Sequence, residues 1–108
     1  LKDLGRWAGI FGKGKLLNPD SFAELICRPE RINRPDLYFA SGFVVANGWY
    51  LQNPSFNGYS GAFGYLPSKE LTIIIYTTQS QDPKSDAQAF QIFKEMVELI
   101  IPEAIINF

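Results

Sequence analysis

Residues 53–78, NPSFNGYSGAFGYLPSKELTIIIYTT, determine the fold that this sequence predicts. The second half, residues 71–76, is a run of leucine, isoleucine and tyrosine with a single threonine, too short for a helix of its own. Such a run, rich in β-branched side chains, is typical of a strand that is buried on both faces. Between the halves, Pro67 presets a turn angle, and the polar residues up to Glu70 keep the turn in water. The stretch therefore predicts two antiparallel strands joined by a tight turn.

The first of these strands, predicted over residues 56–66, carries glycine at every third position, at Gly58, Gly61 and Gly64. Glycine inside a strand lowers its stability and marks a bulge or the close approach of a ligand or another part of the chain. Tight packing of a helix against the strand is the favoured interpretation. The aromatic residues nearby could line a pocket, although core and cross-strand pairs are the commoner role. They are Tyr59, Tyr65 and Trp49.

The residues before this stretch predict a strand hairpin. Residues 38–46 are apolar enough for one strand, and residues 49–52 form its return. Asn47 and Gly48 between them are the strongest short hairpin signal, because both central residues of a type I′ turn need a positive φ. Pro54 cannot donate a hydrogen bond to a strand ladder, so the chain is expected to bend there.

Helices are predicted on both sides of the strands. Residues 1–11 place apolar side chains at helical spacing, and Asn18 is the predicted N-cap of a second short helix. Asp82 and Pro83 are expected to open a long last helix, which Pro102 closes. The predicted fold is therefore α+β, with short N-terminal helices, an antiparallel meander of three to four strands and a long C-terminal helix.

The composition excludes several classes of function. With 108 residues there is room for a single domain and one modest core. The net charge is -1 and no basic run occurs, so nucleic acid is not an expected partner, and no apolar run is long enough to span a bilayer. The absence of histidine excludes a Ser-His-Asp triad, a Cys-His pair and the usual histidine-containing zinc sites within this chain. No metal or cofactor is expected.

Two other groups of polar residues have ordinary interpretations. Cys27 is the single cysteine, so no internal disulfide can form. We expect a buried, inert thiol, because no histidine is present to activate it. Arg28, Arg31 and Arg34 are interpreted as a solvated loop, in preference to an anion-binding site.

Short motifs occur in a fixed order over nearly the whole chain. They are DLGRW at residues 3–7, GKLLNPDS at residues 14–21, NGYS at residues 57–60 and PSKEL at residues 67–71, followed by a hydrophobic strand at residues 72–78. In order and spacing the chain resembles the C-terminal part of the serine β-lactamase and penicillin-binding-protein superfamily, in particular its class C-like hydrolases and esterases. The resemblance, like the start at leucine instead of methionine, implies a C-terminal segment of a larger protein.

The resemblance also implies where the chemistry lies. In the family the nucleophile belongs to a Ser-x-x-Lys motif and the general base to Tyr-x-Asn; both precede this region, and neither occurs here. No catalytic residue is therefore expected in this chain. The family's third motif, Lys-Thr-Gly or His-x-Gly on the strand that edges the active site, falls at Gln52, Asn53 and Pro54. An amide thus replaces the cation or imidazole, which puts recognition of a β-lactam carboxylate in doubt.

The same edge strand supplies the candidate substrate-binding residues, which are Gln52, Asn53, Ser55 and Asn57. In the family, the backbone amide of the residue after the third motif is one of the two oxyanion-hole donors, and by this count it belongs to Ser55. Such an amide contributes to catalysis only beside a nucleophile. The alternative is a polar strand end that bends at Pro54 and has no role in a site.

Two classes of function remain open. In the first, the chain is part of a bacterial serine hydrolase that acts on β-lactams, D-Ala peptides or small esters, and the parent is periplasmic or secreted. In the second, it is a non-catalytic binding or assembly module with the same sheet. The expected partner is the remainder of the parent hydrolase. The isolated chain is expected to self-associate, as a homodimer through the sheet or by exchange of the last helix, because the family's further strands and its covering helical domain lie outside this chain.

Overall fold

A computed structural model of the chain describes residues 1–30, 34–82 and 87–107. Over these residues α1 (Lys2–Gly12) and α2 (Pro19–Ile26) come first, and α3 (Gln88–Ile100) with the 3-10 helix η3 (Pro102–Ala104) comes last. The strands between them are β1 (Leu37–Phe39), β2 (Val44–Ala46), β3 (Trp49–Gln52), β4 (Ser55–Phe56), β5 (Tyr59–Leu66) and β6 (Leu71–Thr78). The predicted α+β class is confirmed, but the described sheet has six strands instead of three to four.

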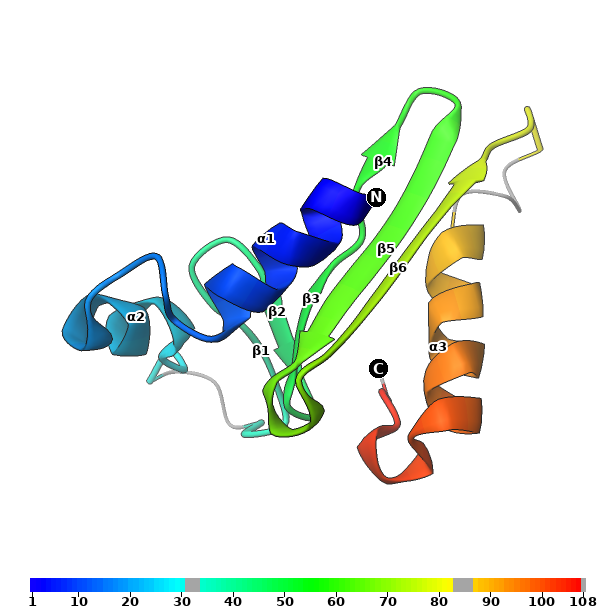
Figure 1. Cartoon of the computed structure of the whole chain (residues 1–108). Coiled ribbons are helices and arrows are strands. Elements are labelled where there is room, and N and C mark those ends of the chain that lie inside the picture. The colour runs from blue at the N-terminus through cyan, green and yellow to red at the C-terminus, as the bar shows by residue number, and fades with distance from the viewer. Residues whose placement is uncertain (31–33, 83–86, 108) are drawn as a thin grey trace.

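The strand β5 organises the sheet, and all strand pairs are antiparallel. Along one edge β5 pairs with β3 and β4, and along the other edge it pairs with β6 over its full length. The hairpins β1–β2 and β2–β3 extend the sheet beyond β3. Figure 1 shows the long β5–β6 ribbon with α1 on one side and α3 on the other. Residues 53–78 therefore contain the centre of the sheet, as their sequence predicts.

The two strands predicted over residues 38–46 and 56–66 are each divided in two. The first reverses direction between β1 and β2, where Gly42 has a φ of 97°, a left-handed conformation that favours glycine. The second contains a hairpin loop at Asn57 and Gly58, and Gly58 has a φ of 85°. The additional strands arise because these glycines lie in reversals of the chain and not inside strands.

The tight turns predicted from local sequence are confirmed. Asn47 and Gly48 have φ values of 43° and 85°, both positive as a type I′ turn between β2 and β3 requires. The connection from β5 to β6 is the 3-10 helix η1 (Pro67–Lys69), which Glu70 completes with a φ of 49°. The first turn sets the register of the β2–β3 hairpin, and the second sets the register of the β5–β6 hairpin.

The helix ends also follow local rules. Asn18 caps α2, because its Oδ1 accepts the Ser21 N–H at 2.8 Å. Beyond the end of α1, Gly14 has a φ of 71° and its N–H donates to the Phe11 carbonyl at 2.9 Å, as in a Schellman motif. The start of α2 and the end of α1 are therefore each fixed by a local hydrogen bond.

The last helix begins later than predicted. α3 starts at Gln88, and Asp82 lies in a bend in which its N–H donates to Ser80 Oγ at 3.2 Å. Pro83, the other half of the predicted start, lies outside the described residues. An Asp-Pro pair also favours turn initiation, so it does not by itself identify the first residue of a helix. The predicted end at Pro102 is confirmed, since η3 begins there.

The faces of the sheet are covered by different helices. α3 packs on one face, where Trp49, Phe93, Val97 and Ile106 are the largest fully buried side chains. Gly64 permits this close packing, because a Cβ at this position would lie only 2.7 Å from Phe93 Cζ. This contact confirms the helix-packing interpretation for Gly64, whereas a Cβ at Gly61 would meet Tyr76 and Pro54 and Gly58 lies in the hairpin loop. The opposite face is covered in part by α1.

The strand β6 is covered from both sides but is less buried than its composition predicts. Ile73 belongs to the α3 core, and on the other face a Cβ at Gly5 of α1 would lie 3.6 Å from Ile74 Cδ1. Within residues 71–76 only Ile73 is buried, and Tyr76 is exposed. The reason is position: among the described strands β6 pairs with β5 alone, so it forms an edge of the sheet.

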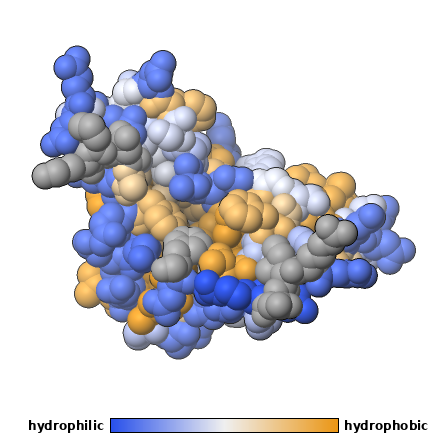
Figure 2. Space-filling model, turned by 180° about the vertical axis from the view of Figure 1, so that it is seen from behind, coloured by the Kyte–Doolittle hydropathy of each residue, from blue (hydrophilic) through white to orange (hydrophobic). Residues whose placement is uncertain are grey.

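Large hydrophobic side chains also lie on the surface. Those with the greatest exposure are Leu1, Trp7, Ile10, Leu16, Leu17, Phe39, Phe56, Tyr59, Tyr76, Leu99 and Ile100. Seen from the side opposite to Figure 1, hydrophobic residues reach the surface in the middle of the molecule, between hydrophilic borders (Figure 2). The described chain thus retains uncovered apolar surface beside a closed core.

Candidate functional site

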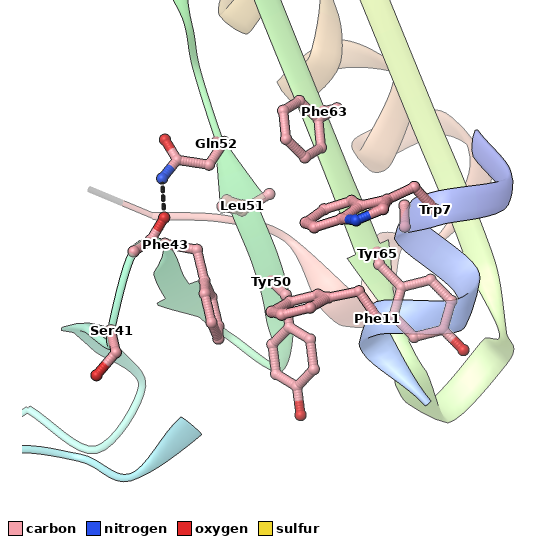
Figure 3. A pocket seen from close by; sticks show the side chains of 11 residues that line it. Trp7, Phe11, Ser41, Phe43, Tyr50, Leu51, Gln52, Phe63 and Tyr65 are labelled. Atoms are coloured by element: carbon pink, nitrogen blue, oxygen red, sulfur yellow. Dashed lines mark hydrogen bonds between the residues drawn. The ribbon is translucent and has the colours of Figure 1, made fainter. Parts of the chain in front are cut away.

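Gln52 lies at the end of β3, with its side chain on the α1 face. Side chains alternate along a strand, and the neighbouring Leu51 belongs to the α3 core. The Nε2 of Gln52 donates a hydrogen bond to the Gly42 carbonyl, which joins the end of β3 to the β1–β2 loop. Figure 3 shows this bond at the border of a pocket. Gln52 therefore shapes the boundary of a cavity.

The backbone amide of Ser55 faces the outer edge of the sheet. Phe56 pairs with Tyr59 across the hairpin loop, and the Gly61 N–H donates to the Pro54 carbonyl at 2.8 Å. Hydrogen-bonded and non-hydrogen-bonded pairs alternate in an antiparallel ladder, so Ser55, which lies between these two positions, exchanges no ladder bonds. Its N–H therefore points away from β5, to a side where no described strand pairs with β4.

The four predicted site residues lie along one edge and do not converge on a single point. Gln52 and Ser55 pair with positions of β5 that are three residues apart, which corresponds to roughly 10 Å along a strand. Asn57 is exposed in the hairpin loop beyond β4. Asn53 is exposed as well and lines an apolar depression of about 310 Å³ with Phe90 of α3. Of the four, Gln52 alone lines the pocket on the α1 face.

This pocket has a volume of about 260 Å³ and lies between α1, β3, β5 and the β1–β2 loop. We call it the aromatic pocket, and it is lined by Trp7, Ala8, Phe11, Ser41, Gly42, Phe43, Tyr50, Leu51, Gln52, Phe63 and Tyr65. Figure 3 shows the rings of α1 turned toward those of the strands. The lining contains no charged side chain.

The rings around the aromatic pocket form a continuous series of contacts. Trp7 and Phe11 are stacked, with centroids 4.8 Å apart and planes 6° apart. Phe11 meets Phe43 edge-on at 5.3 Å, and Phe43 meets Tyr50 at the same distance. Tyr50 in turn lies 6.5 Å from Tyr65. These separations are within the range that aromatic pairs prefer, so ring contacts hold α1 to the strands.

The β1–β2 loop, which forms one wall of the pocket, is fixed by backbone hydrogen bonds. The Ala40 N–H donates to the Phe43 carbonyl at 2.9 Å, and the Ser41 N–H donates to the Leu25 carbonyl of α2 at 3.2 Å. The bond from Gln52 adds a third attachment. The wall is therefore held in place without a ligand, and a ligand would not have to order it on binding.

Ionised groups are kept out of the aromatic pocket. Burial raises the pKa of Tyr50 above its ordinary value, and Tyr38 and Tyr65 shift the pKa in the same direction. A separate, polar depression of about 330 Å³ includes Lys13 and Glu70, whose Nζ and Oε1 are 3.0 Å apart. The hydrogen bond to Glu70 raises the pKa of Lys13.

Other polar candidates lie away from the pocket. Cys27 is exposed, which corrects the prediction of a buried thiol; it follows α2, and α2 buries none of its residues. Arg28 and Arg34 are exposed, as expected for a solvated loop, and Arg34 pairs with Asp36 at 3.2 Å. Arg31 lies outside the described residues.

The three aromatic residues that the sequence suggested for a pocket lie in three different environments. Trp49 belongs to the α3 core, Tyr59 is exposed, and Tyr65 lines the aromatic pocket. The sequence did not single out the other rings of the pocket, which are Trp7, Phe11, Phe43, Tyr50 and Phe63. The one available signal is the spacing of Trp7 and Phe11 on a helix face, and it does not distinguish a pocket from a core.

Comparison with protein-family models, with curated proteins and with solved structures gives no match to this chain. Within the described residues no group of three or more His, Cys, Asp or Glu side chains could hold a metal ion. No helix in the described part of the chain is long and apolar enough to cross a membrane. Function therefore has to be inferred from the geometry of the site and the motifs of the sequence.

Proposed function

We propose that this chain is the C-terminal segment of a β-lactamase-related serine hydrolase, which works through an acyl-enzyme. The nucleophile and the general base belong to another part of the parent protein, and this segment supplies one edge of the active site. The observation that carries the proposal is the outward-facing N–H of Ser55, directly after the position of the family's third motif. The remainder of the parent is the partner of this chain.

Two of the edge residues, Ser55 and Gln52, have a defined role in this proposal. The Ser55 N–H donates to the oxyanion that develops on the substrate carbonyl, next to the nucleophile of the parent. Gln52 presents a neutral amide where the family has a cation or an imidazole. A neutral amide cannot balance the charge of a carboxylate. Small esters and uncharged amides are therefore favoured over β-lactams as substrates.

The arrangement of the elements supports the proposal. The NGYS motif lies in and after the β4–β5 hairpin loop, and the PSKEL motif forms η1 and the start of β6. α3 lies across one face of the sheet, as the resemblance implies for the last helix. The candidate edge, residues 52–57, borders the face on which α1 leaves part of the sheet uncovered.

The test is a pair of substitutions at Ser55 in the complete reading frame, with acylation by a fluorophosphonate probe and a fluorescent penicillin as the readout. Ser55→Pro removes the N–H without breaking a ladder bond, and we expect a loss of about 100- to 1,000-fold in the acylation rate. Ser55→Ala keeps the N–H and serves as the matched control, so its rate should stay near that of the wild type.

The present chain alone is expected to show no acylation and no turnover of a nitrophenyl ester. Labelling of a serine within these 108 residues, or equal rates for the two Ser55 variants, would refute the assignment. A complete reading frame without Ser-x-x-Lys would favour the second class of function, a non-catalytic binding module. The preformed and uncharged aromatic pocket is the observation that favours this alternative.

A further inference from the structure

We infer that the aromatic pocket binds a small, flat, uncharged ring group between α1 on one side and β3 and β5 on the other. Size gives the first limit. A cavity of about 150 Å³ lined by apolar side chains is known to hold benzene. The volume of about 260 Å³ in this chain therefore admits a group of one or two fused rings.

The shape of the lining favours a flat ring over an aliphatic group. Trp7 and Phe11 present stacked planes, and Phe43 and Tyr50 present tilted ones. Trp7 is 44% exposed, so part of its ring remains available for contact. An aromatic guest can adopt the offset-stacked or edge-on arrangements that these rings already make with one another.

The electrostatics of the pocket favour an uncharged ligand. No charged side chain lines the pocket, and the Nε2 of Gln52 already donates to the Gly42 carbonyl. A charged group would lose its hydration without gaining an ionic partner, which is unfavourable. The polar side chains Ser41 and Gln52 lie at the border of the pocket, as Figure 3 shows, and leave its interior apolar.

The neighbouring edge strand indicates that the ring group is part of the substrate. Gln52 lines the pocket and also belongs to the proposed active-site edge. A ring held in the pocket would thus be attached to the reacting ester or amide of the substrate. This assignment to a substrate rests on the hydrolase function proposed above, whereas binding of the ring rests on the pocket alone.

Nuclear magnetic resonance can locate the binding, because the chain has two tryptophans on opposite faces of the sheet. Trp7 borders the pocket, and the Trp49 indole N–H donates to the Ala104 carbonyl at 3.0 Å in the α3 core. On titration of the ¹⁵N-labelled chain with 2-naphthol, we expect the Trp7 indole resonance to shift and saturate at a dissociation constant below about 1 mM. The Trp49 resonance should stay in place.

Two matched ligands test the chemistry of the guest. Decahydro-2-naphthol has the same skeleton without the flat rings, and we expect it to bind several-fold more weakly. 2-Naphthoate has the rings with an added charge, and we expect it to bind at least about 10-fold more weakly. Equal affinity for either ligand would overturn the corresponding part of the inference.

Two variants test the location. Ala8→Leu fills the pocket from the side of α1. Phe63→Leu removes one aromatic ring from the lining at nearly constant side-chain volume, and it replaces Ala8→Leu as the test if that variant does not fold. Both should weaken 2-naphthol binding at least several-fold, whereas Leu99→Ala, on the exposed side of α3, should leave it unchanged. Shifts of equal size at both tryptophans, or no shift up to the solubility limit of 2-naphthol, would overturn the pocket assignment. If 2-naphthol binds to this chain but the parent protein is not acylated by the fluorophosphonate or penicillin probe, the pocket assignment stands. Only the hydrolase function is then refuted.

Discussion

The two faces of the sheet differ in how completely they are closed. On the α3 face the end of the chain completes the cover: the Trp49 indole N–H donates to the Ala104 carbonyl at 3.0 Å, and Asn47 Nδ2 donates to the Ile105 carbonyl at 2.8 Å. On the α1 face the aromatic pocket stays open, and α1 buries only Ala8 and Gly12. One sheet thus has a closed core beneath α3, with an apolar depression at its border beside Phe90, and an accessible aromatic pocket on the other side.

Because of this difference, the two faces are expected to contribute differently to the stability of the fold and to ligand binding. A closed, well-packed core stabilises the folded chain through every methylene group that it buries, and changes in it are costly. Residues on the partly covered face contribute less to stability, because part of their surface remains in water in the folded state. Substitutions on the α3 face should therefore act mainly on folding, and those on the α1 face mainly on recognition.

The largest effect is expected at Phe93, at the centre of the closed face. Phe93 is fully buried against Trp49, with ring centroids 5.4 Å apart. Phe93→Ala should lower the free energy of unfolding by about 3–5 kcal/mol, because it leaves a cavity that the packed sheet cannot fill. Urea denaturation followed by circular dichroism measures the loss. Leu99→Ala on the same helix is the control, since Leu99 is 84% exposed and should change stability by less than about 0.5 kcal/mol.

A smaller loss is expected where α1 meets the sheet most closely. A Cβ at Gly12 would lie 2.0 Å from Tyr65 Cδ1, so Gly12→Ala must displace the ring or the helix. We expect a loss of about 1–3 kcal/mol, even though alanine favours the helix. Gly9→Ala is the matched variant on the same helix, because its Cβ would meet nothing within 4 Å, and it should gain about 0.5–1 kcal/mol. Equal effects of the two variants would show that α1 is not docked as described.

The parts of the fold that the sequence predicted are those that local chemistry specifies. Asn47 and Gly48 identified the β2–β3 turn through their positive φ, Asn18 identified the start of α2 through its cap, and Pro102 identified the end of α3. In each case the signal and the structure lie within a few residues of each other. Such features do not depend on the rest of the chain.

Glycine was harder to interpret, because its role depends on contacts that are distant in sequence. Gly42 and Gly58 occupy reversals of the chain, whereas Gly64 occupies a strand against Phe93, and a sequence window does not distinguish these cases. The same limitation affects the site. Gln52 was selected through the resemblance, but the pocket beside it is formed by rings from α1, β3 and β5, whose proximity only the fold reveals.

The uncovered part of the α1 face predicts self-association of the isolated chain. Phe56, Tyr59 and Tyr76 are 62%, 55% and 39% exposed, and the pairs Phe56–Tyr59 and Gly61–Tyr76 place them together at the β4–β5 end of the sheet. Sedimentation velocity at tens of micromolar should therefore detect a dimer. Phe56→Ser should weaken it about 10-fold, equivalent to about 1.4 kcal/mol. Phe39→Ser is the control on the opposite face, where a 72% exposed ring is removed. A compact monomer that does not bind a hydrophobic dye would contradict the prediction.

The smallest effect on stability, and the sharpest separation of binding from folding, is expected at Gln52. Its amide holds the exposed Gly42 carbonyl, and a partly solvated hydrogen bond of this kind contributes about 0.5 kcal/mol, so Gln52→Ala should lower the melting temperature by no more than about 4 °C. In the complete hydrolase the same variant removes the amide that Gln52 presents in place of the family's cation or imidazole, and kcat/KM should fall several-fold. Leu99→Ala, on the exposed side of α3, is the control, because Leu99 lies outside the candidate edge and the aromatic pocket. A large loss of stability with unchanged kcat/KM would make Gln52 a structural residue and leave Ser55 as the only edge residue with a role in the chemistry.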